Sequence, residues 1–317
     1  MQHVTLSNGI TINFQDEGKK SSPTIILIMG LGAHMAIWPD ELYYGLVDKG
    51  FRVIRFDNRD AGRSSQLDDL NPPSIFKVWL SNQLPFKTNI PYKLDDMAND
   101  VLEIMAVLKI KRAHLVGASM GGMIAQILAA KYKKKVSSLT SIMSTTSMPK
   151  LSKSNLNIML KLAHRPNQNT PNAAINYTIK LNRLIESPAF PNDEQRLRRL
   201  AKKSIERGYN PAGIKRQLVA ITASGSRRAL MRDIKAPTLV IHGTDDPVIS
   251  VNAGIETAHQ IKKAKLKIVE GLGHDFPPEL MKKWVKWISK HVLKSEQKRA
   301  AQKLKKQVNG NLDTFMK

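Results

Sequence analysis

Hydrophobic residues recur along this chain in short continuous runs bounded by glycine, proline and polar residues. One run, 113–116, is followed directly by the glycine-rich segment 117–122 and then by the apolar stretch 123–128. Two later runs, 236–243 and 266–270, are equally short and rich in β-branched residues. Runs of this kind predict buried strands, and the stretch after 122 predicts a helix. The pattern therefore favours an α/β fold, with a mostly parallel sheet flanked by helices.

The turn between the first of these strands and its helix has a specific sequence. Gly117-Ala118-Ser119-Met120-Gly121 fits the G-x-S-x-G pattern of a nucleophile turn. Such a turn holds its serine in a strained corner above the sheet, and small neighbours are needed because strand and helix nearly touch there. Ser119 is therefore a candidate nucleophile. On this motif alone, a glycine-rich turn that only begins a helix remains an alternative.

A proton acceptor and an acid follow two other predicted strands. Asp245 and Asp246 come directly after the run 236–243, and His274 lies four residues beyond the run 266–270. Loops beyond the carboxyl ends of strands in an open α/β sheet converge on one site. We therefore expect Ser119, one of the two aspartates and His274 to meet, in the chain order Ser, Asp, His.

Further segments support a family resemblance that covers about residues 3–290. The chain resembles the serine hydrolases of the α/β-hydrolase superfamily, because the segment 28–32 (IMGLG) stands where that family has its oxyanion-hole loop. The segment 55–65 (RFDNRDAGRSS) is similar to the family's turn after the next core strand. Within the superfamily, the pattern is most similar to aclacinomycin-methylesterase-like and haloperoxidase-like esterases, and to proline-iminopeptidase-like proteins.

The resemblance implies a choice between the two aspartates. The family spacing Gly-x-x-Asp selects Asp246, and adjacent residues point in different directions, so only one carboxylate can face the imidazole. We expect Asp245 to cap the turn or face solvent.

The implied chemistry is acyl transfer in two steps. His274 takes the proton of Ser119 and returns it to the leaving alcohol, while Asp246 fixes the tautomer of the imidazole. The backbone N–H of Met120, at a helix N-terminus, is one expected oxyanion donor. The resemblance places the other at the N–H of Leu31.

Other site classes find little support in the sequence. A dinucleotide fingerprint fails because the position that should hold its third glycine is Met35, and no Walker-type motif occurs. The chain has no cysteine and no H-E-x-x-H motif. We therefore expect no cofactor and no metal site.

The chain is expected to consist of a catalytic core, an inserted cap and a tail. Residues 146–235 are helical in pattern and punctuated by proline, with helices expected at 156–162 and 194–200. An insertion between the serine and the acid predicts a cap that shapes the pocket and excludes water. The expected boundaries are 1–145 and 236–290 for the core, 146–235 for the helical cap and 291–317 for a basic C-terminal tail.

Charge is the feature that an esterase explains least. The net charge of the 317 residues is +24, and residues 282–306 hold ten Lys and Arg against the single acid Glu296. Trp284, Trp287, Ile288 and Leu293 are expected to pack the first part of this segment on the core. Such a field attracts anionic surfaces weakly, but no nucleic-acid motif accompanies it. The chain also lacks cysteine, a basic leader and an apolar signal segment, so we expect a cytoplasmic protein.

The function predicted from these observations is the hydrolysis of a small-molecule carboxylic ester. The same triad could instead serve a C–C bond hydrolase, a perhydrolase or an aminopeptidase. A non-catalytic binding protein on this scaffold is disfavoured because candidates for all three triad roles are present. The substrate and the oligomeric state are not specified by the sequence.

Overall fold

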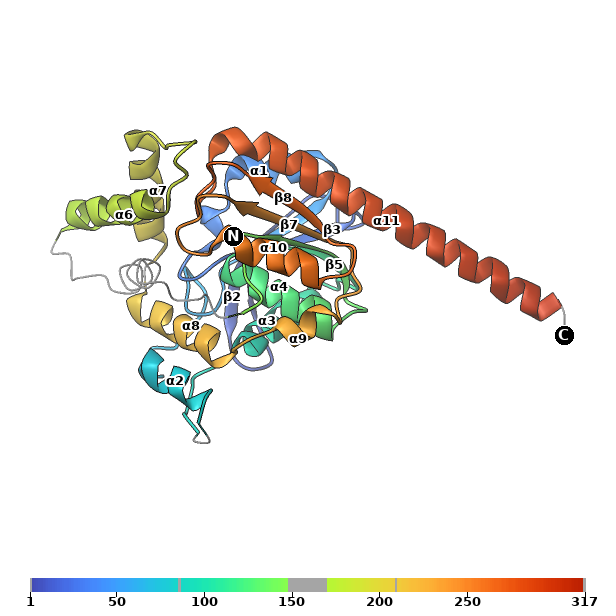
Figure 1. The fold of residues 1–317 in the computed structure, drawn as a ribbon, viewed down its shortest axis with the longest axis horizontal. Helices are drawn as coiled ribbons and strands as arrows, with labels where there is room; N and C mark the ends of the chain where they lie inside the picture. The colour runs from blue at the N-terminus through green and yellow to red at the C-terminus, as the bar shows by residue number, and fades with distance from the viewer. Residues whose placement is uncertain (1, 85–86, 148–169, 209, 316–317) are drawn as a thin grey trace.

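An eight-stranded sheet forms the centre of the molecule. The computed structural model describes residues 2–84, 87–147, 170–208 and 210–315 (Figure 1). The strands lie in the order β1-β2-β4-β3-β5-β6-β7-β8. All pairs from β4 to β8 are parallel, and only β1 and β2 run antiparallel to their neighbours. The strands are β1 (Gln2–Thr5), β2 (Thr11–Glu17), β3 (Thr24–Ile28), β4 (Arg52–Phe56), β5 (Ala113–Ala118), β6 (Val136–Ile142), β7 (Thr238–Gly243) and β8 (Lys265–Val269). The predicted α/β class with a mostly parallel sheet is confirmed.

Helices cover both faces of this sheet. Ile26 and Ile28 of β3 pack into a core shared with α3, α4 and α10, whereas Ile25 and Leu27 pack with α1 and α11. Successive side chains of a strand point to opposite faces, so a strand covered on both sides must be apolar throughout. This explains the continuous hydrophobic runs in the sequence. The covering helices are α1 (Asp40–Asp48), α3 (Leu94–Val107), α4 (Met120–Lys131), α10 (Val251–Gln260) and α11 (Pro278–Phe315).

Between β6 and β7 the chain leaves the sheet and forms further helices. Their bounds are α6 (Pro171–Ile185), α7 (Glu194–Arg207), α8 (Pro211–Ala223) and α9 (Arg228–Met231). In Figure 1, α6 and α7 stand beside the sheet, and α8 continues down toward the short helix α2 (Ile75–Ser81). A small apolar cluster that includes Ile179 and Leu197 joins α6 to α7. The helix expected at 194–200 lies within α7, and the one expected at 156–162 lies outside the described residues.

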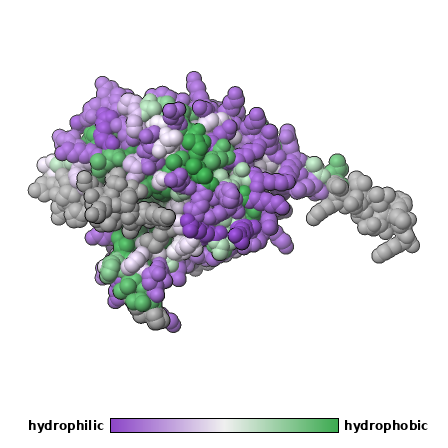
Figure 2. All heavy atoms as spheres, viewed as in Figure 1, coloured by the Kyte–Doolittle hydropathy of each residue, from purple (hydrophilic) through white to green (hydrophobic). Residues whose placement is uncertain are grey.

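The last helix, α11, runs unbroken past residue 290, and the basic C-terminal tail expected at 291–317 continues it as far as Phe315. Trp284 and Ile288 are fully buried, and burial continues to Val292 and Ser295. Leu293, which we expected on the packed face, is 49% exposed. Beyond the body the helix projects into solvent (Figure 1). Within the described part of the chain, no helix combines the length and apolarity needed to span a membrane. Hydrophilic side chains cover most of the face seen in Figure 2.

Candidate active site

Ser119 occupies the sharp turn between β5 and α4. Its backbone has φ 53° and ψ −119°, a region that residues with a side chain rarely adopt. The lack of space around this turn explains why glycines stand at positions 117 and 121. A Cβ at Gly117 would lie 2.2 Å from the carbonyl oxygen of Gly121, and one at Gly121 would lie 1.9 Å from that of Ile28. The turn therefore tolerates no larger residue at these positions, and it presents the serine hydroxyl above the end of the sheet.

The hydroxyl of Ser119 lies within hydrogen-bond distance of an imidazole that in turn contacts a carboxylate. His274 Nε2 is 3.0 Å from Ser119 Oγ, and His274 Nδ1 is 2.7 Å from Asp246 Oδ2. The backbone N–H of His274 donates to the carbonyl of Ile185 at 2.8 Å, which fixes the loop that carries the ring. The three side chains come from the loops after β5, β7 and β8, as expected for the carboxyl ends of parallel strands.

Asp246 is held as a buried anion. Its Oδ1 accepts the backbone N–H groups of Val248 at 2.9 Å and Ile249 at 2.8 Å, and only 7% of the residue is exposed. Burial alone would raise the pKa of this carboxyl, but His274 and His242 outweigh it and lower the pKa to about 2. Asp245, by contrast, is exposed, and its Oδ2 accepts the hydroxyl of Thr244. Asp246 is thus the aspartate that meets His274.

A second histidine, which sequence reasoning left without a role, touches the same carboxylate. His242 is fully buried at the end of β7, and its Nε2 lies 2.7 Å from the carbonyl oxygen of Ile249 and 3.3 Å from Asp246 Oδ2. Both neighbours are acceptors, so Nε2 carries the hydrogen. The signal available in the sequence was the four-residue spacing of His242 and Asp246 around a turn.

Two backbone N–H groups border the serine without a partner. Met120 opens α4, and Leu31 lies in the turn after β3, where Gly30 approaches so closely that a Cβ there would stand 3.1 Å from the Cβ of Ser119. Among the described residues, neither the N–H of Leu31 nor that of Met120 makes a hydrogen bond. Donors free in this way can receive a developing oxyanion.

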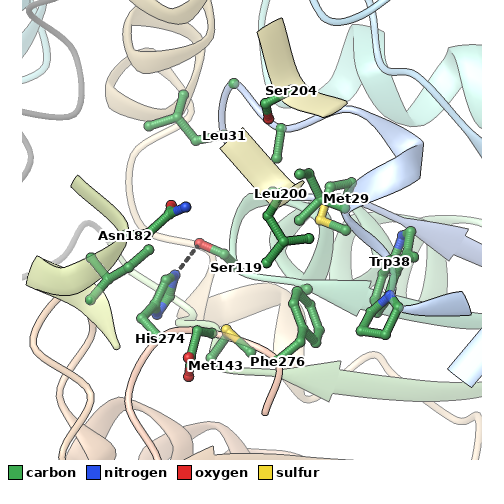
Figure 3. Close-up of a pocket in the computed structure, with 18 of the residues that line it drawn as sticks. Met29, Leu31, Trp38, Ser119, Met143, Asn182, Leu200, Ser204, His274 and Phe276 are labelled. Carbon is green, nitrogen blue, oxygen red and sulfur yellow. Dashed lines mark hydrogen bonds between the residues drawn. The ribbon is translucent and has the colours of Figure 1, made fainter. Parts of the chain in front are cut away.

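A cavity of about 440 Å³ opens over Ser119 (Figure 3). Its described walls are mainly apolar and come from the loop after β3, from the core and from helices α6 and α7. Its polar lining includes Asn182, Ser204 and His274, which Figure 3 labels at the wall, and the charged residues Asp40, Glu41, Arg196, Lys203 and Asp275. The apolar lining includes Met29, Leu31, Trp38, Met143, Leu181, Ile185, Leu197, Leu200 and Phe276.

No group of three or more potential metal ligands occurs within the described residues. His34, near the cavity, is buried, and burial lowers its pKa to about 4. The Nε2 atom of His34 lies 3.2 Å from the hydroxyl oxygen of Ser204 on α7. His34 is therefore neutral at ordinary pH and is one polar contact between the core and α7.

Comparison with known proteins identifies the family. A family model described as the alpha/beta hydrolase fold matches residues 23–279. The chain belongs to the α/β-hydrolase fold family. This confirms the resemblance predicted from the nucleophile turn and the two loops.

Named relatives of this α/β hydrolase include esterases and lactonases. It is 26% identical over 290 residues to a rhodomycin D methylesterase of Streptomyces sp. (strain C5), covering 84% of this chain and 90% of the relative. It is 25% identical over 261 residues to 3-oxoadipate enol-lactonase 2 of Acinetobacter baylyi, covering 82% and 85%. Among solved structures, an enol-lactonase from Burkholderia xenovorans LB400 superposes with a TM-score of 0.72 at 21% identity, covering 92% of this chain and all of that one. The structural likeness establishes the fold.

Proposed function

We propose that this α/β hydrolase cleaves carboxylic esters through an acyl-enzyme formed on Ser119. The observation that carries the proposal is the hydrogen-bonded series from Ser119 through His274 to the buried Asp246, at the floor of an apolar cavity. Relatives named as a methylesterase and an enol-lactonase support the same reaction class, because a lactone is a cyclic ester.

In the first half-reaction, Ser119 Oγ attacks the ester carbonyl carbon while its proton passes to His274 Nε2. The carbonyl oxygen becomes an oxyanion that the N–H groups of Leu31 and Met120 receive. A donor of this kind contributes about 3 kcal/mol to the lowering of the barrier. When the intermediate collapses, the C–O bond to the alcohol breaks, and the imidazolium protonates the leaving oxygen.

In the second half-reaction, water attacks the acyl-serine. His274 takes a proton from the water and returns it to Ser119 Oγ as the carboxylic acid leaves. Asp246 remains ionised throughout, because its pKa is about 2. It accepts the Nδ1–H of the imidazole and stabilises the imidazolium in both steps.

The shape and polarity of the cavity favour esters with a substantial apolar group. A volume of about 440 Å³ accommodates a ligand of drug-like size, and such pockets use a few polar groups to orient an apolar ligand. Helices α6 and α7 supply Leu181, Leu197 and Leu200 to the wall. We therefore assign these helices the role of a cap that selects the acyl or alcohol group and keeps water from the acyl-enzyme.

The acyl-enzyme can be tested directly by covalent labelling. A fluorophosphonate probe is expected to label the protein at a single site, and peptide mass spectrometry is expected to locate the adduct on Ser119. A panel of p-nitrophenyl esters of increasing chain length should be hydrolysed, the longer acyl groups with the lower KM. Labelling of another residue, or no labelling together with no ester turnover, would contradict the proposal. Turnover of a C–C bond or peracid substrate without ester turnover would favour the alternative chemistries of this triad.

A surface of α11 favours, in addition, weak association with anionic lipid. Five exposed lysines recur every fourth residue along one ridge of the helix, and two more lie on the neighbouring edge strand β8. Among the described residues, none of them forms an ion pair with an acid. We define this lysine ridge as Lys282, Lys286, Lys290, Lys294 and Lys298, flanked by Lys265 and Lys267. Each lysine near an anionic membrane contributes about 1 kcal/mol of attraction.

Vesicle binding tests the lysine ridge. The protein is expected to sediment with phosphatidylserine-containing vesicles but not with pure phosphatidylcholine vesicles, and to be released at high salt. Replacing Lys286, Lys290 and Lys294 by glutamate should lower the vesicle partition coefficient at least tenfold. The matched control replaces three exposed lysines elsewhere (Lys19, Lys20 and Lys49) and should have a smaller effect. Equal effects of the two variants, or binding to duplex DNA but not to vesicles, would contradict this assignment.

A further inference from the structure

The turn that carries the proposed oxyanion donor cannot hold its own position. Gly30, Leu31 and Gly32 include two glycines, and Gly32 has φ +63°. Among the described contacts of this turn, the bond that closes it from within is a long one, 3.3 Å from the N–H of Ala33 to the carbonyl of Gly30. Glycine gives the backbone more freedom than any other residue. A donor placed here needs contacts from other elements to keep it aimed at the serine.

Both ends of the turn are fixed by the loop that follows β4. The carbonyl of Met29 accepts the side-chain amide of Asn58 at 3.0 Å, and the N–H of Met35 donates to Asp57 Oδ1 at 2.7 Å. Asp57 is fully buried and forms an ion pair with Arg207 at the end of α7, at 2.8 Å. These contacts restrain both ends of the segment 29–35. They do not restrain its centre, the turn 30–32.

The centre is held by Gln217, which lies 185 residues away in sequence on α8. Its Oε1 accepts the N–H of Gly32 at 2.7 Å, and its Nε2 donates to the carbonyl of Arg59 at 2.8 Å. The side chain of Gln217 is fully buried, which shields its bond to Arg59 from water, whereas Gly32 is half-buried at the wall of the cavity. Since the amide uses its oxygen on one loop and its nitrogen on the other, it has one orientation only.

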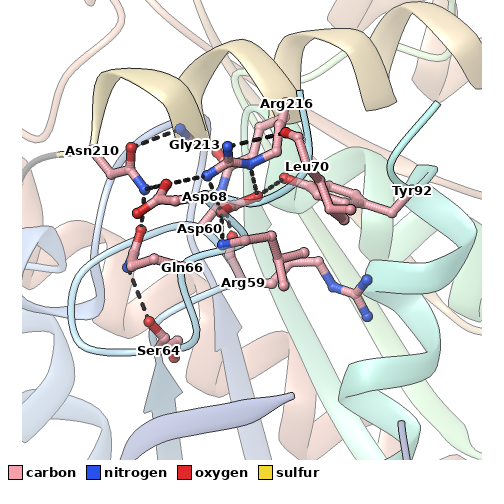
Figure 4. Close-up of polar contacts among 12 residues, drawn as sticks. Arg59, Asp60, Ser64, Gln66, Asp68, Leu70, Tyr92, Asn210, Gly213 and Arg216 are labelled. Atoms are coloured by element: carbon pink, nitrogen blue, oxygen red, sulfur yellow. Dashed lines mark hydrogen bonds and ion pairs between the residues drawn. The ribbon is translucent and has the colours of Figure 1, made fainter. Parts of the chain in front are cut away.

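The helix that carries Gln217 is itself fixed on the core (Figure 4). Arg216 forms two hydrogen bonds with Asp60, at 2.9 and 2.7 Å, and a third with Asp68 at 2.8 Å. Asp60 also accepts the hydroxyl of Tyr92 at 2.6 Å. At Gly213 the helix lies so close that a Cβ would stand 2.5 Å from the carbonyl oxygen of Asp60. Paired, bidentate contacts of this kind define both distance and angle.

From this arrangement we infer that Gln217 is a positioning residue for ester hydrolysis, which sets the place of the Leu31 N–H through its bond to Gly32. The inference rests on the proposed function. Arg216 fixes α8 against the loop after β4 through its bonds to Asp60. Gln217, the next residue of α8, then fixes the turn 30–32 through its bond to Gly32. A displacement of about 1 Å in a reacting geometry can cost about a hundredfold in rate. The segment between β6 and β7 therefore contributes to transition-state stabilisation as well as to the pocket wall.

The test replaces Gln217 with methionine, which has a similar length and neither hydrogen-bonding group. We expect kcat for a p-nitrophenyl ester to fall about 10- to 100-fold while KM changes less than threefold, because the ground state does not need the oxyanion donor. The affinity for an alkyl trifluoromethyl ketone, which forms a tetrahedral adduct, should fall by the same factor as kcat/KM. Gln217→Glu keeps an acceptor for Gly32, but only a protonated carboxyl can also donate to the carbonyl of Arg59, so this variant is expected to lose less activity than Gln217→Met only where its carboxyl is protonated.

The matched control is Thr222→Val on the same helix. The hydroxyl of Thr222 is buried and, among the residues that the structure describes, bonds only to the carbonyl of Leu218, one turn back, so its loss should lower the melting temperature without the change in kcat. Hydrogen exchange of segment 29–35 gives a readout that does not depend on activity, and only Gln217→Met should accelerate it. Unchanged exchange, or faster exchange with unchanged kcat and ketone affinity, would overturn the inference. A wild-type protein without Ser119-dependent turnover, but with the expected change in exchange, would overturn the proposed function alone.

Discussion

Replacing Ser119 with alanine is expected to lower kcat for a carboxylic ester by about a millionfold. The loss is this large because serine, histidine and aspartate act as one unit, so that removing the nucleophile removes the whole covalent pathway. Residual turnover comes from the oxyanion donors and from substrate binding. Single-turnover measurements on a p-nitrophenyl ester, with enzyme in excess, should detect the residual rate.

The control for this variant is a second buried serine beside the same turn. Ser144 donates to the carbonyl of Ser119 at 2.7 Å and, within the described part of the chain, makes no hydrogen bond to the imidazole. Its replacement by alanine removes one buried hydrogen bond, and kcat is expected to stay within about tenfold of wild type. Retention of most activity in Ser119→Ala, with an unchanged melting temperature, would show that another group performs the chemistry.

The parts of the fold that follow local rules could be predicted from sequence. Continuous apolar runs in the sequence predicted the parallel strands, because both faces of these strands are buried. The Asn8-Gly9 dipeptide between β1 and β2 is typical of a hairpin turn, and Gly9 has a positive φ of 81° there. The turn at Ser119 could also be predicted from the sequence, since steric clashes leave room only for glycine at positions 117 and 121. In each case, the cause lies within a few residues of its effect.

No pattern in the sequence indicated the long-range contacts that fix the site. Arg207, Arg216 and Gln217 meet partners that lie between 150 and 185 residues away. In the sequence they are ordinary members of a basic helical segment, and only the packing of α8 on the core reveals their partners. Asp57 lies in the segment 55–65 that the sequence singled out, but nothing in that segment indicated its pairing with Arg207.

The second prediction separates the two adjacent aspartates. Asp246→Asn is expected to lower kcat by about ten-thousandfold through the tautomer of His274. The Oδ1 of residue 246 accepts two backbone N–H groups, so an asparagine must keep its oxygen there. Its NH₂ group would then face His274 Nδ1 and donate to it. The imidazole would carry its hydrogen on Nε2, where it can no longer take the proton of Ser119.

Asp245→Asn is the matched control, since it makes the same chemical change one residue away. Asp245 is exposed, and within the described part of the chain its carboxylate accepts only the neighbouring hydroxyl of Thr244, so kcat should stay within about threefold of wild type. Because the pKa of Asp246 is about 2, the wild-type carboxylate is ionised from pH 5 to pH 9. Over that range neither the wild-type carboxylate nor the asparagine amide changes its protonation. The ratio of the wild-type kcat to the kcat of Asp246→Asn should therefore stay high from pH 5 to pH 9. A larger loss in Asp245→Asn than in Asp246→Asn would contradict the proton relay, because the carboxylate that orients the imidazole would then be the one that faces solvent.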